Sequence, residues 1–282
     1  MIKSFVKHRI LGKDKKQYTM KISIVTICYN VENDIEQTIL SVINQSYTDL
    51  EYIIIDGASK DKTLEIVNRY KDKISKIVSE PDKGIYDAMN KGIKQATGEW
   101  VGFINAGDKY VDNNVLSTFF AKVSSNADVA YGVLVHCFSY GKFMMLPSSL
   151  QTINSAMPFG HPASFVKRTL LQQYQFDCRF RIAADYDLFY RLYHDGKNFQ
   201  FVEVVISEFE AENGVSSRLF YKTFRETSLV NGSYNTPSYW YNLVKQGTII
   251  NFKRFLSMIF PKIVKKWDIL QKKNSRIFRQ VK

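Results

Sequence analysis

The chain is poor in cysteine, and its few cysteines follow no recognisable pattern. Among 282 residues there are only Cys28, Cys137 and Cys178. An odd number without close spacing implies neither a disulfide framework nor a zinc site. A reducing compartment such as the cytoplasm fits this cysteine usage best.

We expect neither a leader nor a membrane span. Residues 1–20 carry scattered Lys and Arg and no apolar core of the length that a signal peptide needs. Elsewhere, Lys or Arg interrupts every apolar run before it reaches the roughly 20 residues that a spanning helix requires. We therefore expect a cytoplasmic protein that does not cross a membrane.

Glycine-rich phosphate loops are absent as well. No G-x-G-x-x-G follows the first predicted strand, and G-x-x-x-x-G-K-[ST] does not occur. A dinucleotide-binding fold and a P-loop fold are therefore disfavoured. A nucleotidyltransferase that makes a nucleotide sugar stays open as an alternative, although no glycine-rich loop is present to hold its triphosphate.

Positive charge is plentiful but is confined to the two ends of the chain. Of the net charge of +12, residues 1–21 contribute +6 and residues 251–282 contribute +9, which leaves −3 for the middle. A nucleic-acid-binding fold would carry its basic surface on the core, so we predict no nucleic-acid partner. We predict three regions: a basic extension over 1–20, a globular core over 21–215 and a helical, basic C-terminal region over 216–282.

Strands and helices alternate along the core. Apolar, β-branched runs predict strands at 21–27, 52–55, 74–78 and 100–104, and helical spacing of apolar residues predicts helices at 34–45, 64–70, 84–96 and 115–123. This alternation predicts an α/β fold with a mainly parallel sheet flanked by helices. Such sheets bind ligands at the carboxyl ends of their strands.

Three of these strands end in polar clusters: Tyr29-Asn30-Val31-Glu32, Asp56-Gly57-Ala58-Ser59 and Asn105-Ala106-Gly107-Asp108. Each cluster alone is typical of a turn or a helix cap. In a parallel sheet, however, all three meet at one edge, where a divalent cation could bridge a diphosphate to a carboxylate. Because Mg²⁺ and Mn²⁺ favour oxygen ligands, we predict that Asp108 holds such a metal.

A second acidic feature opens a predicted helix. Asp185 and Asp187 stand in the first turn of the segment Ala183-Ala184-Asp185-Tyr186-Asp187-Leu188. One interpretation is a helix cap with favourable dipole placement, which contributes about 0.5–2 kcal/mol. The other is a general base, since a carboxylate at a helix start that faces a cleft can deprotonate an attacking hydroxyl.

Taken together, four segments resemble the family 2 inverting glycosyltransferases. The segments are Ser23–Asn30, which ends in a Tyr-Asn signature; Ser41–Tyr47; the Asp-Gly-x-Ser-x-Asp-x-Thr-like loop Asp56–Thr63; and Glu80–Gly92. The last is similar to a segment of a bacterial surface-polysaccharide subgroup. The likeness covers residues 21–215 and implies the nucleotide-binding GT-A fold.

The resemblance also implies roles for single residues. Asp185 would be the catalytic base of a single displacement that inverts the anomeric carbon, and Asp108 would be the last residue of a metal-binding Asp-x-Asp motif. Tyr29, Glu32 and Asp56 would contact the base and ribose of the donor, a UDP-sugar above all. The full implied donor set is Tyr29, Asn30, Glu32, Asp56, Ser59, Lys83, Gly84, Asn90 and Asn105.

Two positions depart from the family pattern. Asn105 stands where the metal motif has its first carboxylate, so metal affinity would be weaker or depend mainly on the diphosphate. Ala184 stands where a Glu precedes the catalytic Asp, so the base rests on Asp185 alone. A non-catalytic nucleotide-sugar-binding relative therefore stays open as an alternative.

The acceptor side is less well marked. His161 lies in a segment that resembles the acceptor-side strand of the family, although a core histidine of a strand is the plainer interpretation. Asp187 is an acceptor-side candidate with a structural role as its alternative. Lys83 is a phosphate ligand or a solvated loop lysine.

The C-terminal region carries a basic amphipathic stripe. Apolar residues recur every three or four positions from Phe252 to Leu270, lysines and Arg254 fill the gaps, and Pro261 kinks or divides the helix. We predict attachment to the anionic inner face of a membrane, which would bring the enzyme to a lipid-linked saccharide acceptor. Packing on the core or on a second subunit of a homodimer is the alternative.

Overall fold

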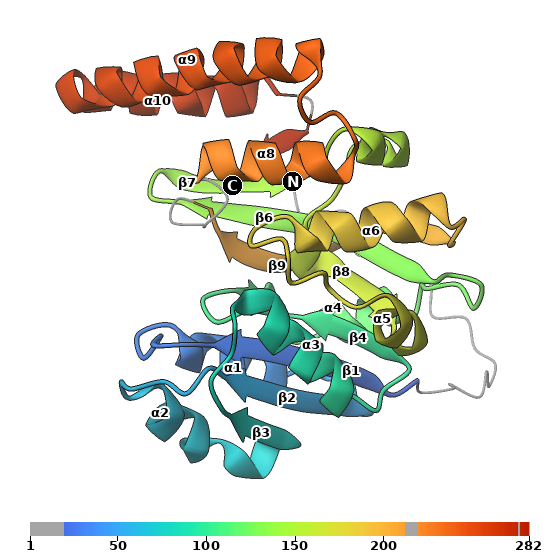
Figure 1. Ribbon diagram of the computed structural model, residues 1–282. Coiled ribbons are helices and arrows are strands. Elements are labelled where there is room, and N and C mark those ends of the chain that lie inside the picture. Colours follow the sequence, from blue (N-terminus) through green and yellow to red (C-terminus); the bar gives the residue numbers. More distant parts are fainter. Residues whose placement is uncertain (1–19, 212–218, 276, 282) are drawn as a thin grey trace, which may run out of the picture.

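The computed structural model describes residues 20–211, 219–275 and 277–281. The predicted extension over 1–20, apart from Met20, and the predicted boundary between 215 and 216 lie outside the described residues. The described residues form one mixed sheet with helices on both faces (Figure 1).

The first half of the sheet is parallel, as the apolar runs predict. Its strands lie in the order β3-β2-β1-β4, and Ile22 of β1 is in register with Leu50 of β2 and Trp100 of β4. The strands are β1 (Ile22–Cys28), β2 (Leu50–Asp56), β3 (Lys76–Ser79) and β4 (Trp100–Phe103). They alternate with α1 (Ile35–Ile43), α2 (Thr63–Arg69), η1 (Lys71–Lys73) and α3 (Ile85–Gln95).

The second half of the sheet is largely antiparallel. β8 pairs with β4, β6 with β8, β7 with β6, and β10 with β7, while β9 runs parallel to β6 and pairs with the short β5. The bounds are β5 (Lys109–Tyr110), β6 (Val129–Phe138), β7 (Gly141–Met145), β8 (Ser164–Lys167), β9 (Phe199–Glu210) and β10 (Phe278–Gln280). No periodic pattern in the sequence predicts these long-range pairings.

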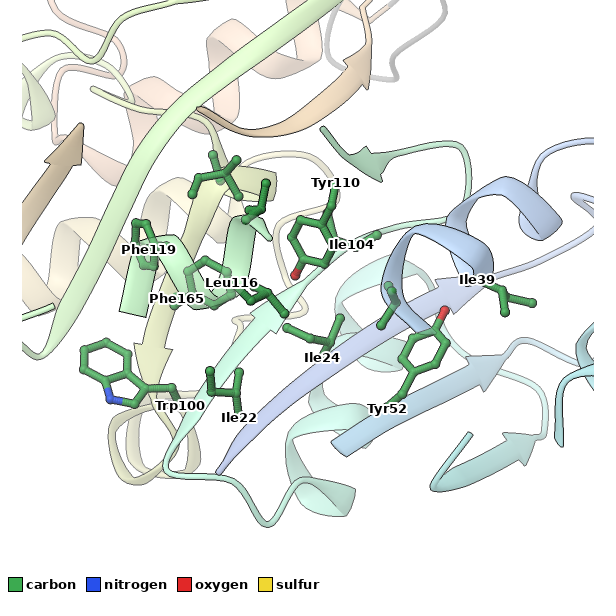
Figure 2. Packing of buried hydrophobic residues seen from close by; sticks show 14 of the residues in the cluster. Ile22, Ile24, Ile39, Tyr52, Trp100, Ile104, Tyr110, Leu116, Phe119 and Phe165 are labelled. Carbon is green, nitrogen blue, oxygen red and sulfur yellow. The ribbon is translucent and has the colours of Figure 1, made fainter. Parts of the chain in front are cut away.

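The core lies on both faces of the sheet because successive residues of a strand point to opposite sides. Ile22 and Ile24 of β1 pack in the cluster that contains α1 and α4 (Val115–Phe120), which Figure 2 shows. Val25 and Ile27 pack in the other cluster, with α3 and α6 (Ala184–His194). Each such buried side chain contributes about 1.5–3 kcal/mol, which fixes the strand ends that carry the polar loops.

His161 is not in a strand, contrary to the plainer sequence interpretation. It opens the short helix η3 (His161–Ala163), and β8 begins only at Ser164. Pro162 explains the difference, since proline has no N–H to donate to a strand ladder. The other short elements of this region are η2 (Leu150–Asn154) and α5 (Arg168–Tyr174).

The C-terminal region is helical, as predicted, and returns to the sheet at its end. It consists of α8 (Phe220–Val230), α9 (Pro237–Ile259) and α10 (Pro261–Lys273) before β10. Pro261 divides the predicted stripe between α9 and α10, which lie side by side at one end of the molecule (Figure 1). Among the described residues, none of the helices combines the length and the apolar character that crossing a bilayer demands.

Candidate functional site

The loops that follow β1 and β2 are joined by hydrogen bonds. The backbone N–H of Asn30 donates to Oγ of Ser59 at 2.9 Å, and the Oδ1 of Asn30 accepts from the N–H of Lys60 at 2.8 Å. Glu32 accepts from the N–H of Lys62 at 2.9 Å. The sheet thus brings Asn30, Glu32 and Ser59 together, while the ring of Tyr29 stays 56% exposed beside them.

Asp56 is the buried anchor of the second loop. Its Oδ1 accepts from Oγ of Ser59 at 2.5 Å, and its Oδ2 accepts from Oγ of Ser79 at 2.6 Å and from the N–H of Ser59 at 3.0 Å. The side chain is fully buried. Its contacts are therefore to the protein itself in this structure, and a bond to a nucleotide base stays a prediction.

The loop after β3 lies against the same edge. A Cβ placed on Gly57 would be 2.5 Å from Oδ2 of Asp82, so glycine permits the close approach of the two loops. The guanidinium of Arg181 donates to the carbonyl of Lys83 at 2.5 Å. Gly84 has φ +127°, a conformation that favours glycine. Lys83 and Gly84 are thus connected both to the β2 loop and to the segment before α6.

The turn after β4 is held by a buried threonine. Oγ1 of Thr38 donates to the carbonyl of Asp108 at 2.7 Å and accepts from the N–H of Gly107 at 3.0 Å. The N–H of Ala106 bonds to the carbonyl of Ile27 in β1, so the turn sits at the carboxyl edge of the sheet. Gly107 has φ +100°. This turn is therefore rigidly built rather than a loose surface loop.

Asp108 and the Oδ1 of Asn105 are both buried, and hydrogen bonds compensate this burial only in part. Burial raises the pKa of Asp108 to about 8; a backbone hydrogen bond from Glu210 offsets part of that rise, and the charge of Glu210 adds to it. The buried Oδ1 of Asn105 has no hydrogen-bond partner. A buried carboxylate that is only partly compensated and an amide oxygen without a donor suit a hard divalent ion. The described residues contain no cluster of three or more His, Cys, Asp or Glu side chains with metal-site geometry.

Asp185 lies partly buried in the first turn of α6. The hydroxyl of Tyr86 lies 3.2 Å from its Oδ1 and donates to the carbonyl of Ile182 at 2.6 Å. Oδ1 also accepts from the N–H of Tyr186 at 2.8 Å. Burial, followed by the charge of Asp185, raises the pKa of Tyr86 well above its ordinary value, so the phenol stays protonated.

His161 lies among aromatic rings, and the negative charge of Asp185 acts on its imidazole. Its ring stacks on Phe103 with centroids 5.5 Å apart and meets Phe176 edge to face. Burial lowers the pKa of His161, and the charge of Asp185 only partly opposes this effect. The imidazole is therefore neutral near pH 7, and its role on the acceptor side stays a prediction.

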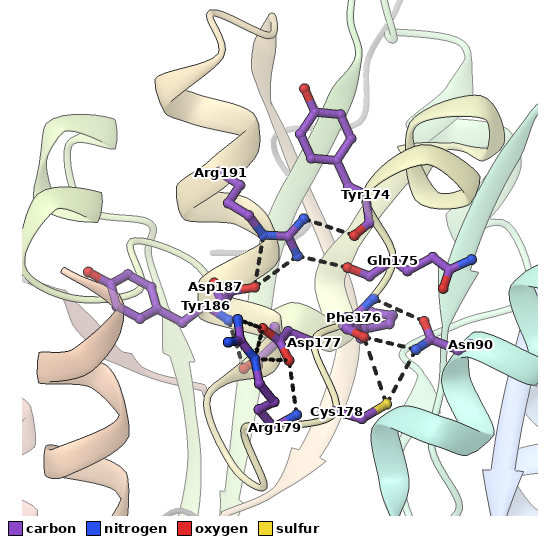
Figure 3. Close-up of polar contacts among 11 residues, drawn as sticks. Asn90, Tyr174, Gln175, Phe176, Asp177, Cys178, Arg179, Tyr186, Asp187 and Arg191 are labelled. Carbon is purple, nitrogen blue, oxygen red and sulfur yellow. Dashed lines mark hydrogen bonds and ion pairs between the residues drawn. The ribbon is translucent and has the colours of Figure 1, made fainter. Parts of the chain in front are cut away.

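Asp187 and Asn90 are occupied by structural contacts (Figure 3). Asp187 accepts from Nε and Nη2 of Arg191 at 2.9 and 2.8 Å, and Arg191 also donates to the carbonyls of Tyr174 and Gln175. Both ends of the Asn90 amide bond the backbone of Phe176 at 2.9 Å. These contacts connect α3 and α6 to residues 174–178, and the predicted roles of Asn90 at the donor and Asp187 on the acceptor side stay predictions.

The sequence-based prediction missed four residues of this edge: Thr38, Tyr86, Arg181 and Glu226. Tyr86 belongs to the Glu80–Gly92 segment that carries the family resemblance, which is a signal that could have found it. The others offer no local signal, because their partners are far away in the chain: 70 residues for Thr38, 98 for Arg181 and 44 for Glu226.

Solved structures share the fold. A fragment of S. aureus TarS, residues 1–349, in complex with UDP-GlcNAc has a TM-score of 0.62 and 20% identity, covering 77% of this chain and 68% of that one. Of a longer TarS chain that was also solved, this chain spans only 39%. A mannosyltransferase of Pyrobaculum calidifontis in complex with GDP-Man and Mn²⁺ has a TM-score of 0.58 and 15% identity, covering 90% and 85%. These likenesses confirm the GT-A fold.

Sequence relatives agree with the fold. A PGL/p-HBAD biosynthesis glycosyltransferase of Mycobacterium tuberculosis is 28% identical over 212 residues, which are 72% of this chain and 81% of the relative. An uncharacterised glycosyltransferase of Haemophilus influenzae is 31% identical over 136 residues, which are 47% and 54%. The family described as Glycosyl transferase family 2 matches residues 23–193. This match covers the three polar clusters at the sheet edge and Asp185, and the chain belongs to glycosyl transferase family 2.

Proposed function

We propose that the chain is an inverting glycosyltransferase that moves a sugar from a UDP-sugar to a hydroxyl of a saccharide acceptor. The observation that carries this proposal is the position of Asp185. Asp185 lies in the first turn of α6, and the hydroxyl of Tyr86 bonds its carboxylate. Arg181, in the turn just before this helix, bonds the carbonyl of Lys83 in the loop after β3. A general base therefore lies beside loops that can hold a nucleotide diphosphate.

Donor binding uses the joined loops at the sheet edge. The exposed ring of Tyr29 offers a face for the base, and Asn30, Glu32 and Ser59 offer polar groups for the ribose. Asp56 accepts a hydrogen bond from the nucleotide base once the hydroxyl of Ser59 has rotated away from the Asp56 carboxylate. Lys83 is exposed on the adjoining loop, where its ammonium can approach a phosphate.

Asp108, with the amide oxygen of Asn105, would hold the divalent cation, Mn²⁺ or Mg²⁺. The buried carboxylate of Asp108 and the unpartnered amide oxygen of Asn105 fit such an ion, and phosphate oxygens would supply the remaining ligands. When bound, the ion neutralises charge on the departing diphosphate. Because Asn105 adds no charge, the affinity for metal depends on the diphosphate more than in a site with two carboxylates.

Asp185 performs the proton transfer. The acceptor hydroxyl gives its proton to the Asp185 carboxylate as its oxygen bonds the anomeric carbon, and the bond from that carbon to the diphosphate oxygen breaks. The diphosphate leaves on the face opposite the attack, so the configuration inverts. Tyr86 and the N–H of Tyr186 hold the carboxylate in one orientation for this step.

The named relatives support the donor class. TarS was solved with UDP-GlcNAc, and the P. calidifontis mannosyltransferase with GDP-Man and Mn²⁺. These ligands belong to those proteins, and by analogy we propose a nucleotide-diphosphate donor with a metal here. UDP is the favoured nucleotide, as the family resemblance implies.

We also propose that the α9–α10 pair rests on the anionic inner face of a membrane and there meets a lipid-linked acceptor for surface polysaccharide synthesis. Its exposed apolar residues include Val244, Ile249, Phe252, Phe255, Met258, Ile259, Ile263, Trp267 and Leu270. Met258 is 82% exposed, which is uncommon for so apolar a side chain. Lysines such as Lys262 and Lys266 border this surface, and an amphipathic, basic helix of this kind lies in the headgroup region.

The test of the donor class is a panel of UDP-, GDP- and dTDP-sugars incubated with the full chain, Mn²⁺ and saccharide acceptors, with released nucleotide and product measured together. The proposal is supported if sugar is transferred from UDP-sugars and the anomeric proton coupling in the NMR spectrum of the product shows the inverted configuration. Product with retained configuration, or pyrophosphate release from a nucleoside triphosphate with a sugar phosphate, contradicts it.

A further inference from the structure

Glu226 of α8 is a buried carboxylate that bonds the backbone just before the proposed base. Its Oε2 accepts three N–H groups, those of Arg181 at 3.0 Å, Ile182 at 2.8 Å and Ala183 at 3.1 Å. The side chain is only 5% exposed. Because a buried carboxylate is costly unless it is well bonded, this arrangement holds the 181–183 turn in one conformation.

The start of α6 has no cap of its own. Ala183 occupies the N-cap position and makes no side-chain hydrogen bond. The free N–H groups at this end of the helix and its positive dipole favour a negative group there. Glu226 supplies that group from another helix, while the only carboxylates of the first turn are Asp185 and Asp187 themselves.

A short chain of contacts leads from Glu226 to the reacting carboxylate. Glu226 fixes Ile182 through its N–H, the carbonyl of Ile182 accepts from the Tyr86 hydroxyl, and that hydroxyl lies 3.2 Å from Oδ1 of Asp185. Glu226 therefore sets where the turn, Tyr86 and Asp185 lie relative to one another. It lies outside residues 23–193, the part of the chain that the family match covers.

We propose that Glu226 is a positioning residue for the catalytic base, so that the C-terminal region completes the active site. The inference rests on the proposed role of Asp185. A displacement of a catalytic group by about 1 Å can cost a factor of about 100 in rate, so loss of this anchor acts on kcat rather than on donor binding.

The test compares Glu226→Gln with Glu51→Gln in the full chain. Glu51 is a matched control, because it is also buried and also bonds several donors, yet it lies at the amino end of the strands, away from the site. We expect E226Q to lower kcat about 10- to 100-fold with an unchanged donor KM, and E51Q to lower the melting temperature without changing kcat. Glu226→Asp keeps the charge and should recover part of the loss.

A second comparison separates positioning from general damage. In the D185N background, E226Q should cause no further loss of the residual transfer, because the group it positions is already gone. Unchanged kcat in folded E226Q, or an equal fractional loss in the D185N background, overturns the inference. If E226Q does not fold, full activity of E226D overturns it instead. Unchanged transfer by D185N alone contradicts the base assignment, which is a separate failure.

Discussion

The hydroxyl of Tyr86 lies 3.2 Å from Oδ1 of Asp185 and bonds the carbonyl of Ile182 as well, so one side chain orients both the base and the turn before it. The ring itself stacks on Phe176 with centroids 5.5 Å apart. Tyr86→Phe keeps this stacking and removes only the hydroxyl. We expect kcat to fall about tenfold, the equivalent of about 1.4 kcal/mol, with little change in donor KM.

Steady-state kinetics with varied donor and acceptor checks this prediction. Tyr70→Phe is a suitable control, since Tyr70 also donates to a carboxylate, that of Glu36 on α1, but it lies just after α2 and away from Asp185. An equal fall of kcat in both variants would show that the effect is not specific to the base.

Asp185→Asn should abolish transfer and spare nucleotide binding. The amide has nearly the shape of the carboxylate and cannot accept the proton of the acceptor, so kcat should fall by about 10²–10⁴. Calorimetric titration with UDP and Mn²⁺ should give an unchanged Kd. Asp187→Asn serves as the neighbouring control: it loosens the ion pair with Arg191 and should lower stability more than kcat. Retained transfer by D185N would rule out Asp185 as the base.

The parallel half of the sheet could be predicted because β1, β2 and β4 contain apolar runs that form their own local signal. Ile22 to Cys28 are buried throughout, and such a strand needs no knowledge of its partners. The antiparallel half could not be predicted in this way. β9 mixes buried Val202 and Ile206 with exposed Glu203, and its register on β6 shifts near Val133.

Some residues of the candidate site could likewise be predicted from the sequence, and others could not. Asp108 and Asp185 follow strand and helix boundaries that the sequence marks, so their chemistry could be proposed from it. The burial that raises the pKa of Asp108 and the unpartnered Oδ1 of Asn105 depend on packing, to which no sequence pattern corresponds. Glu226 is the clearest case, because its three partners are 43 to 45 residues away and its own helix has no motif.

Metal binding should release a proton from Asp108. With a pKa of about 8 the carboxyl group is mostly protonated at pH 7, and a cation binds only the charged form. Apparent Mn²⁺ affinity in the presence of UDP should therefore rise up to about tenfold per pH unit below pH 8 and level off above it. Calorimetry in buffers of different ionisation enthalpy should detect the released proton, which Asp108→Asn should lose. Binding without any proton release would contradict the prediction.

The same group should make the metal-free protein sensitive to alkali. Its folded-state pKa is raised, so its contribution to stability is fully present below the unfolded value of 3.8 and is lost as the pH rises through about 8. The melting temperature of D108N minus that of the wild type should therefore grow between pH 4 and 8. Differential scanning calorimetry with EDTA measures it, and a constant difference across this range would argue against the raised pKa.

Glu51 should have the opposite dependence on pH. Burial raises the pKa of Glu51, but bonds from Ser23, Thr97 and Lys21 outweigh burial and hold the value at about 2, against an ordinary 4.5. Its contribution to stability is therefore present above about pH 4.5 and is lost as the pH falls toward 2. The melting temperature of the wild type should drop steeply over this range, and the drop should be smaller in Glu51→Gln. Parallel curves for the two proteins would contradict this prediction.

The exposed apolar surface of α9 and α10 should bind vesicles that contain anionic lipid. Phe255 and Met258 are 57% and 82% exposed, and a double substitution of both by Asp would place charge where the acyl boundary should lie. We expect co-sedimentation with phosphatidylglycerol vesicles to be lost in this variant and kept in Leu40→Asp. Leu40 is a matched control, since it is also apolar and exposed but lies on α1.

Charge should contribute to the same binding. Each lysine near the headgroups contributes about 1 kcal/mol, so Lys262→Ala with Lys266→Ala should weaken binding by about 30-fold at low salt and by less at high salt. Neutral phosphatidylcholine vesicles should bind the wild type weakly, because they offer no counter-charge. The membrane proposal is wrong if the wild type binds neither kind of vesicle and light scattering shows a dimer that the Asp variant disrupts. In that case the surface joins two copies of this chain.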